Sequence, residues 1–178
     1  MPRTAALAFV LAAAVLTPAS ALRAQSPTAD PADVRSIEDI VRVSYEVISG
    51  PPGTPRQWRR DSTLYAPGAM FHALHQDAQG QVKVTSMTPE EYRRRTDQGF
   101  VKNGLIEYEI GSRVERFGNV AQVRSVYATR RTENGPLLAR GINYFQLYWD
   151  GSRWWIAGMV WEDERPDNPI PADWITAK

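Results

Sequence analysis

Three side chains in the sequence have the chemistry of general acid–base catalysis: the imidazole of His72, the phenol of Tyr127 and the carboxyl of Glu162. A carboxylate becomes a useful proton acceptor where its pocket raises its pKa, and a phenol or imidazole can donate a proton or a hydrogen bond. Together they would suit a lyase or isomerase that needs no cofactor. Glu162 equally fits a solvated strand end, because Asp163, Glu164 and Arg165 follow it.

The histidines, His72 and His75, do not form a metal-binding pattern. A spacing of three sends them to opposite faces of an extended strand, so at most one enters a pocket. The sequence has no Cys, no pair of histidines one helical turn apart and no third ligand at a suitable spacing. We expect neither a metal nor a cofactor.

The first 21 residues have the layout of a secretory signal peptide. Arg3 precedes a small apolar run over 5–16, and the small-residue site Ala19-Ser20-Ala21 follows. The run is shorter than the roughly 20 residues of a membrane helix. We expect cleavage after Ala21, with Ala24 as the alternative, and a periplasmic or secreted protein that is not held in the membrane.

The charge balance points away from nucleic acids and anionic membranes as partners. The chain has 21 Lys and Arg against 20 Asp and Glu, a formal net charge of +1. Removal of Arg3 with the signal peptide brings this to about zero.

The mature chain has room for one domain. Residues 22–30 are a polar leader that we expect to be disordered, and 31–165 form the domain. The tail, 166–178, contains Pro166, Pro169 and Pro171, so it should run extended and be held by Ile170 and Trp174.

Helix signals come first along the domain and strand signals dominate its second half. Predicted helices run from Asp30-Pro31 to Gly50, from Thr54-Pro55 to before Pro67, and from the capping box at Thr88 toward Gly104. Predicted strands cover 69–75 and 81–86, followed by four more from Leu105, with turns at Gly118-Asn119, Asn134-Gly135 and Asp150-Gly151.

Two-residue turns at Gly118-Asn119 and Asp150-Gly151 predict which side chains share a face. The first turn groups Ile106, Tyr108, Ile110, Ser112 and Val114 with Ala121, Val123, Ser125, Tyr127 and Thr129, and it pairs Glu107 with Arg130 on the other face. The second groups Gly141, Asn143, Phe145 and Leu147 with Trp154, Ile156, Gly158, Val160 and Glu162. Both sets share one face only if the loop around Asn134-Gly135 has an odd number of residues.

We expect this shared face to point inward and to line a ligand pocket. Its polar members are Tyr108, Ser125, Tyr127, Asn143 and Glu162. The glycines at 141 and 158 remove side-chain volume near Asn143, which would leave room for a ligand. Gly158 equally fits a strand bend, and the tyrosines equally fit a core with satisfied hydroxyls.

Large aromatic side chains are also expected on the outer sheet face, which predicts a homodimer through that face. The aromatic side chains expected there are Tyr144, Tyr148, Trp155 and Trp161, and Met159 lies among them. Arg113 and Arg124 are predicted to lie opposite each other there, and they need an acidic partner between them.

Residues 58–71 (WRRDSTLYAPGAMF) and 150–162 (DGSRWWIAGMVWE) resemble the second helix with the first strand, and the final hairpin, of the nuclear transport factor 2-like superfamily. This superfamily includes SnoaL-like cyclases, ketosteroid isomerases and scytalone dehydratases. The order of elements is similar over about 33–164. The resemblance implies an α+β fold in which three helices from the N-terminal half pack on a strongly curved, mixed, mainly antiparallel sheet of about six strands, forming a cone with an apolar pocket.

The resemblance leaves three functions open. The first is an exported domain that binds a small apolar molecule, with Tyr65, Tyr108, Ser125, Asn143 and Gly158 in the pocket. The second is a cofactor-free dehydratase or ketosteroid isomerase using His72, Tyr127 and Glu162, although the isomerases' aspartates have no equivalent on the predicted inward face. The third is an interaction module whose own side chains fill the pocket.

Overall fold

A computed structural model describes residues 27–175, so the predicted signal peptide lies outside the described residues. Within them, the helices are α1 (Pro31–Val34), α2 (Ile37–Ile48), α3 (Trp58–Asp61) and α4 (Pro89–Asn103), and a 3₁₀ turn spans Ala172–Trp174. The strands are β1 (Tyr65–Gln76), β2 (Val82–Met87), β3 (Ile106–Phe117), β4 (Val120–Arg130), β5 (Ala139–Trp149) and β6 (Trp154–Asp163). None of the described helices is long and apolar enough to cross a membrane.

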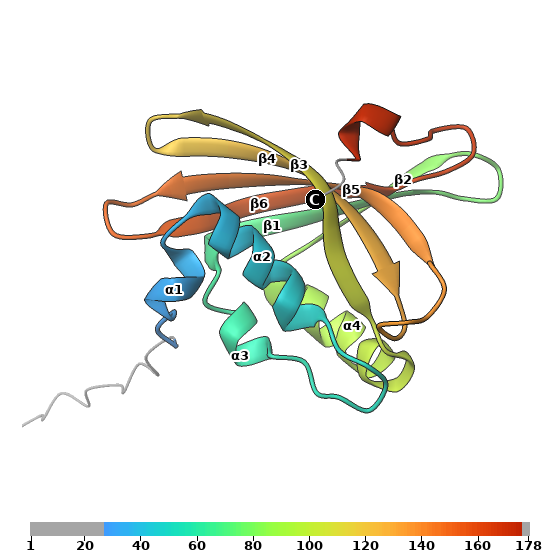
Figure 1. The fold of residues 1–178 in the computed structure, drawn as a ribbon, viewed down its shortest axis with the longest axis horizontal. Coiled ribbons are helices and arrows are strands. Elements are labelled where there is room, and N and C mark those ends of the chain that lie inside the picture. Colours follow the sequence, from blue (N-terminus) through green and yellow to red (C-terminus); the bar gives the residue numbers. More distant parts are fainter. Residues whose placement is uncertain (1–26, 176–178) are drawn as a thin grey trace, which may run out of the picture.

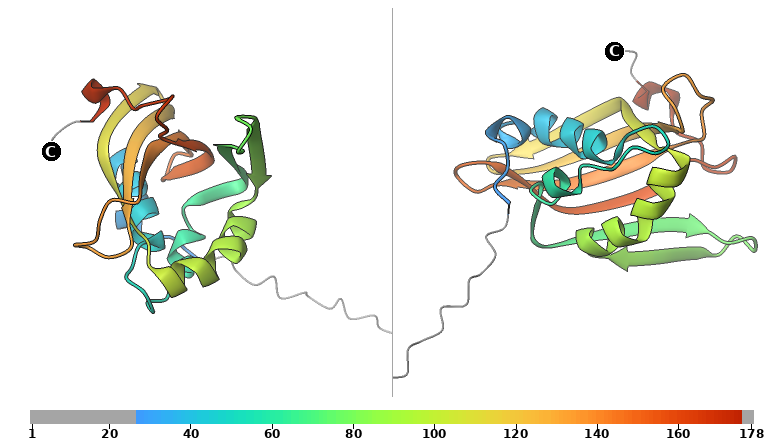
Figure 2. Two further views of the ribbon diagram at one scale, coloured as in Figure 1. Left: turned by 90° about the vertical axis from the view of Figure 1, so that its right-hand side faces the viewer. Right: turned by 90° about the horizontal axis from the view of Figure 1, so that it is seen from below.

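The six strands form one open sheet in the order β2-β1-β6-β5-β4-β3. β1 runs parallel to β6, and every other neighbouring pair is antiparallel. The sheet is strongly curved, and the helices lie on its concave side (Figures 1 and 2). The predicted α+β architecture with a mixed, mainly antiparallel sheet is confirmed.

The first predicted helix is split in two. Asp30 caps α1 as expected, its carboxylate accepting the N–H of Ala32 at 2.9 Å. Ser36 then adopts an extended conformation, and its hydroxyl accepts the N–H of Asp39 at 3.0 Å. This side-chain cap starts α2 anew, because an N-cap residue lies outside the helix that it opens. The second predicted helix is shorter than expected, since Tyr65 already belongs to β1.

Helix α2 supplies the centre of the hydrophobic core. Ile40, Val43 and Val47 are fully buried on its inner face, against Phe145 and other apolar side chains of the sheet. Burial of side chains of this size contributes about 1.5–3 kcal/mol each. α2 is therefore a fixed wall of the domain.

The predicted turn at Gly118-Asn119 is confirmed, since Phe117 pairs with Val120 across it. The predicted face of β3 is correct near this turn, where Ser112 pairs with Ser125. It is wrong beyond Ile110, which is an extra, unpaired residue between Glu109 and Gly111. A one-residue bulge moves every later side chain to the opposite face.

Beyond the β3 bulge, the two glutamates face the concave side. Glu107 pairs with Thr129 and Glu109 with Tyr127, whereas Tyr108 belongs to the other face. The predicted Glu107–Arg130 pair is therefore wrong, and Ile106 stands opposite Arg130 instead.

The last hairpin also contains a bulge. Its loop consists of the four residues 150–153 rather than the predicted two-residue turn, because Trp149 pairs with Trp154. Leu147 pairs with Ile156 rather than with Trp154, so the two still share a face as expected, but Ala157 is an extra residue on β6. From there Met159, Trp161 and Asp163 face inward, and the predicted inward positions of Gly158, Val160 and Glu162 are wrong.

The relation between the two hairpins is confirmed. Ser125 pairs with Asn143 and Tyr127 with Gly141, so both sets share one face. Residues 130–138, an odd number, separate the paired Thr129 and Ala139, although this loop is longer than a three-residue turn.

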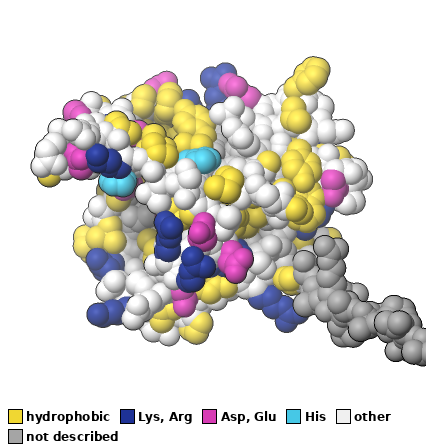
Figure 3. All heavy atoms as spheres, turned by 180° about the vertical axis from the view of Figure 1, so that it is seen from behind, with side chains coloured by type: hydrophobic (Ala, Val, Ile, Leu, Met, Phe, Trp, Pro, Cys, Tyr) yellow, Lys and Arg dark blue, Asp and Glu magenta, His cyan; other side chains and the backbone are white. Residues whose placement is uncertain are grey.

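The chain's own tail covers part of the convex face. The Ile170 N–H donates to the Glu164 carboxylate at 3.0 Å, and the Trp174 ring lies 3.6 Å from the Arg124 guanidinium. Ile170 and Trp174 border a groove with Tyr144 and other side chains of the convex face. Figure 3 shows the molecule from behind, where hydrophobic side chains form separate patches among charged groups and histidine reaches the surface.

Helix α4 is attached differently from α2, because none of its residues is fully buried. The capping box predicted at Thr88 is present, with Glu91 as its partner. The helix is fastened through polar contacts: Arg93 donates to Asp61 at 2.8 Å, and Asp97 accepts the indole N–H of Trp58 at 2.6 Å. Ring contacts of Tyr92 with Phe71 and of Phe100 with Trp58 add to these bonds, so polar contacts and half-buried aromatic side chains hold the helix in place.

We expect Arg93→Leu to lower the free energy of unfolding by about 3–5 kcal/mol, because it leaves Asp61, 1% exposed, as an unpaired buried carboxyl. Arg94→Leu, a neighbour whose side chain is 68% exposed, should change it by no more than about 0.5 kcal/mol. Urea unfolding measures both. The double variant Asp61→Asn/Arg93→Leu should recover part of the loss, and equal effects of the two single variants would contradict this role of the ion pair.

Candidate functional site

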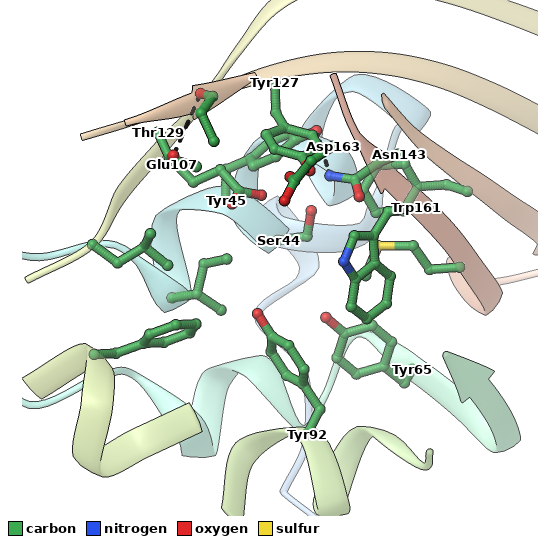
Figure 4. A pocket seen from close by; sticks show the side chains of 16 residues that line it. Ser44, Tyr45, Tyr65, Tyr92, Glu107, Tyr127, Thr129, Asn143, Trp161 and Asp163 are labelled. Carbon is green, nitrogen blue, oxygen red and sulfur yellow. Dashed lines mark hydrogen bonds between the residues drawn. The ribbon is translucent and has the colours of Figure 1, made fainter. Parts of the chain in front are cut away.

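A cavity of about 300 Å³ lies on the concave side of the sheet, between α2 and α4. Its lining residues come from both helices and from five strands of the sheet, β1, β3, β4, β5 and β6 (Figure 4). They are Ser44, Tyr45, Ile48, Tyr65, Tyr92, Phe100, Leu105, Glu107, Tyr127, Thr129, Ala139, Asn143, Phe145, Met159, Trp161 and Asp163. Most of this surface is aromatic or aliphatic, and the carboxyl groups lie together at the sheet end.

Glu107 is the most perturbed acid of the cavity. Burial raises its pKa to about 8, and the nearby charge of Asp163 acts in the same direction, while a hydrogen bond with Asn143 opposes the shift. A carboxyl with such a pKa is mainly protonated at neutral pH and can exchange its proton with a bound molecule near that pH.

Tyr127 and Asp163 form a second polar pair beside Glu107. The Tyr127 hydroxyl donates a hydrogen bond to the Asp163 carboxylate. Burial, that bond and the charge of Asp163 together raise the pKa of Tyr127 far above its usual value. Tyr127 therefore stays a neutral hydrogen-bond donor.

A buried chain of hydrogen bonds supports the polar end from behind. Ser125 donates to the Glu109 carboxylate at 2.7 Å, and the Tyr45 hydroxyl lies 2.7 Å from the Ser125 oxygen. The Tyr45 oxygen also accepts from the Asn143 amide at 3.1 Å. Because the Ser125 hydroxyl donates to Glu109, the Tyr45 hydroxyl donates to the Ser125 oxygen. The Tyr45 oxygen in turn accepts from Asn143, so the chain of bonds fixes the position of the Asn143 amide.

The opposite wall presents the hydroxyls of Tyr65 and Tyr92, which both point into the cavity toward the polar end (Figure 4). Tyr65 donates to Asp61 at 3.2 Å, and Arg93 in turn holds Asp61. Burial raises the pKa of both tyrosines. Among residues 27–175 the Tyr92 hydroxyl has no hydrogen-bond partner, which leaves it available to a ligand.

Three of the predicted site residues line the cavity: Tyr65, Tyr127 and Asn143. His72 does not, since its side chain lies on the other face of β1 with Nδ1 2.8 Å from the Ser86 hydroxyl. Glu162 also points away from the cavity and pairs with Arg165. The structure thus does not bring the proposed acid–base trio together.

The remaining predicted pocket residues have other positions. The Arg130 guanidinium lies over the Tyr108 ring, 5.5 Å from the ring centre. Ser125 lies fully buried behind Tyr45. Gly158 passes close to β1, where a Cβ atom would lie 3.3 Å from the Met70 carbonyl oxygen. This agrees with the alternative of a strand bend.

Four residues that line the cavity were not among the site residues predicted from the sequence: Glu107, Asp163, Tyr45 and Tyr92. Asp163 stands next to the proposed Glu162, so the error there is one position. For Glu107 the sequence gives no signal, because the alternating Ile106, Tyr108 and Ile110 resemble an inward face. The two bulges bring both carboxyls into the cavity. Within the described residues, no group of three or more His, Cys, Asp or Glu could hold a metal ion.

No family model and no curated protein matches the sequence. Solved structures do match the fold. A protein from Parabacteroides distasonis described as a "putative ketosteroid isomerase" is 13% identical, with a TM-score of 0.50 over 80% of this chain and 98% of its own. A protein of unknown function from Mycobacterium tuberculosis is 16% identical, with a TM-score of 0.50 over 78% of this chain and 72% of its own.

A third protein of unknown function, from Nostoc punctiforme and described as having a cystatin-like fold, is 11% identical, with a TM-score of 0.50 over 74% of this chain and 95% of its own. These likenesses show the fold alone. The chain has a nuclear transport factor 2-like, ketosteroid-isomerase-like fold, as the resemblance in sequence implied, and no specific activity follows from it.

The raised pKa of Glu107 predicts a pH-dependent stability. The native state keeps the proton up to about pH 8, whereas the unfolded chain releases it near pH 4.5. The free energy of unfolding should therefore fall as pH rises between these values and level off above, with each unit of pKa difference corresponding to about 1.4 kcal/mol.

We expect Glu107→Gln to flatten this profile in urea unfolding between pH 5 and 9. Glu115→Gln, with a side chain 69% exposed, should follow the wild-type profile. Parallel profiles for wild type and Glu107→Gln would show that Glu107 titrates normally.

Proposed function

We propose that this chain is an exported domain whose cavity binds a small, mainly apolar molecule with a polar end. The cavity, with a volume of about 300 Å³, carries the proposal. It lies at the lower limit of typical ligand sites, which are likewise mostly apolar with a few converging polar groups. Since a sizeable volume is left empty, the alternative of a pocket filled by its own side chains is the weaker one.

The polar end offers several hydrogen-bonding groups to a ligand. Protonated Glu107 can donate to an acceptor on the ligand, and the Tyr92 hydroxyl can do so from the other side. Tyr127 is engaged with Asp163 and contributes by holding that carboxylate in place. The aromatic walls would enclose the apolar body.

A second candidate function is a cofactor-free isomerase or lyase reaction, with Glu107 as the acid–base group in place of His72 and Glu162. The pKa of about 8 favours it, because a proton-transfer group works best when its pKa is near the working pH. The neighbouring Parabacteroides protein is described as a "putative ketosteroid isomerase", which agrees with a proton transfer beside a carbonyl.

A homodimer through the convex face remains part of the proposal, with a changed set of residues. Met159 and Trp161 face the cavity and leave this set. The tail covers the groove beside Tyr144, so the remaining contact surface is the end of the sheet with Tyr148, Trp155 and the 56% exposed Val120.

Ligand binding can be tested with the neutral fluorescent probe N-phenyl-1-naphthylamine. We expect saturable binding by the mature protein and at least about tenfold weaker binding by Ala139→Phe, which places a ring inside the cavity. Leu137→Phe, at a 51% exposed position in the same loop region, should bind like wild type. Equal binding by both variants would place the probe elsewhere and count against the cavity.

Catalysis can be tested with cyclohex-3-enone, whose conversion to the conjugated cyclohex-2-enone is followed by ultraviolet absorbance. We expect acceleration by wild type, a loss of about 100-fold or more in Glu107→Gln, and little change in Glu162→Gln. No acceleration over buffer would rule out this reaction and leave the binding proposal intact.

A further inference from the structure

The cavity lining combines many aromatic rings with acidic groups, and none of its described residues is basic. Seven of its lining residues are aromatic: Tyr45, Tyr65, Tyr92, Phe100, Tyr127, Phe145 and Trp161. Two are acidic, Glu107 and Asp163, and among the described lining residues none is Lys, Arg or His. The site therefore has a negative electrostatic character that its own lining does not neutralise.

Three basic side chains beside the lining residues are engaged with other groups. Arg93 is paired with Asp61 at 2.8 Å, and Arg140 with Glu164 at 2.7 Å. Arg56 donates to three backbone carbonyls around the start of the 50–54 loop and the end of α4. Each of these guanidinium groups already has acceptors, so none is available to compensate Asp163.

The effect of Asp163 on the ionisation of Glu107 indicates which charge on a ligand the site would favour. Burial and the charge of Asp163 together oppose ionisation of Glu107. A bound carboxylate or phosphate would add a further negative charge to this weakly screened space, whereas a bound cation would attract both groups and favour the ionised form of Glu107.

The aromatic wall favours the same kind of ligand. Tyr65 and Tyr92 stand across the cavity from Glu107 and Asp163, and the Trp161 ring, from the same strand as Asp163, packs against Tyr92 with ring centres 6.0 Å apart (Figure 4). An organic cation between them would meet the carboxylates on one side and the negative potential of aromatic rings on the other. A bare metal ion would find only two acidic groups and an apolar surround.

We propose that the cavity selects molecules with an apolar body and a single cationic nitrogen, held between Glu107 and Asp163 on one side and the tyrosine and tryptophan rings on the other. This inference rests on the proposed binding function and narrows it to a class of ligand. Uncharged molecules of the same shape should bind more weakly, and anions should be excluded.

Three probes of similar size separate the possibilities: benzyltrimethylammonium, its neutral isostere neopentylbenzene, and the anion phenylacetate. Isothermal titration of the mature protein should give a dissociation constant at least about tenfold lower for the cation than for the neutral isostere, and no measurable binding of phenylacetate. Equal or tighter binding of neopentylbenzene would overturn the cation preference while the binding proposal stands. Failure of all three probes to bind would overturn both.

A pair of adjacent variants tests the source of the preference. Asp163→Asn should weaken benzyltrimethylammonium about tenfold and leave neopentylbenzene unchanged, which also verifies that the cavity is intact. Glu162→Gln is the matched control, because Glu162 is the preceding residue on the other face of β6 and pairs with Arg165. It should bind both probes like wild type. Equal losses of both probes in Asp163→Asn, or a loss of cation binding in Glu162→Gln, would contradict the assignment.

Discussion

The alternation of side chains along β-strands is the constraint on which the site depends. One extra residue in a strand exchanges the faces of all residues beyond it. Two such residues decide the cavity, Ile110 in β3 and Ala157 in β6, and a further register shift lies between Tyr65 and Met70 in β1. Both bulges act toward the same end of the sheet, so Glu107 and Asp163 enter one cavity. Without them that end would present Tyr108 and Glu162, and the cavity would have a different chemistry on an unchanged fold.

The cavity exists because its two helical walls are held by different forces. α2 is anchored through fully buried aliphatic side chains, which leave little freedom to collapse toward the sheet. α4 stands opposite and contributes Tyr92 and Phe100 to the lining, and it is attached both through Arg93 and Asp97 and through the ring contacts of these two aromatic residues. The empty volume thus lies between a deeply buried wall and a wall held by polar and aromatic contacts.

Much of the fold could be predicted from the sequence, because turns, caps and periodicity are local signals. The capping box at Thr88, the turn at Gly118-Asn119 and the shared face of the two hairpins all follow from short patterns. The site was predicted only in part. A bulge leaves no local mark when the residues before it still alternate as in a regular strand, as Ile106, Tyr108 and Ile110 do. It also leaves none when the residues around it are apolar on both faces, as near Ala157. Tyr127 and Asn143 were identified because they lie on strands without a bulge.

The two helical walls of the cavity differ in how deeply they are buried, and this difference bears on how molecules enter the cavity. No residue of α4 is fully buried, whereas eight residues of α2 are buried. Segments with few buried side chains open at a lower free-energy cost than the core of the same protein. Opening at α4 would expose the cavity without unfolding α2, so the rate of entry would depend on the contacts of α4. Affinity would depend on the acidic groups of the sheet wall, which belong to a different part of the chain.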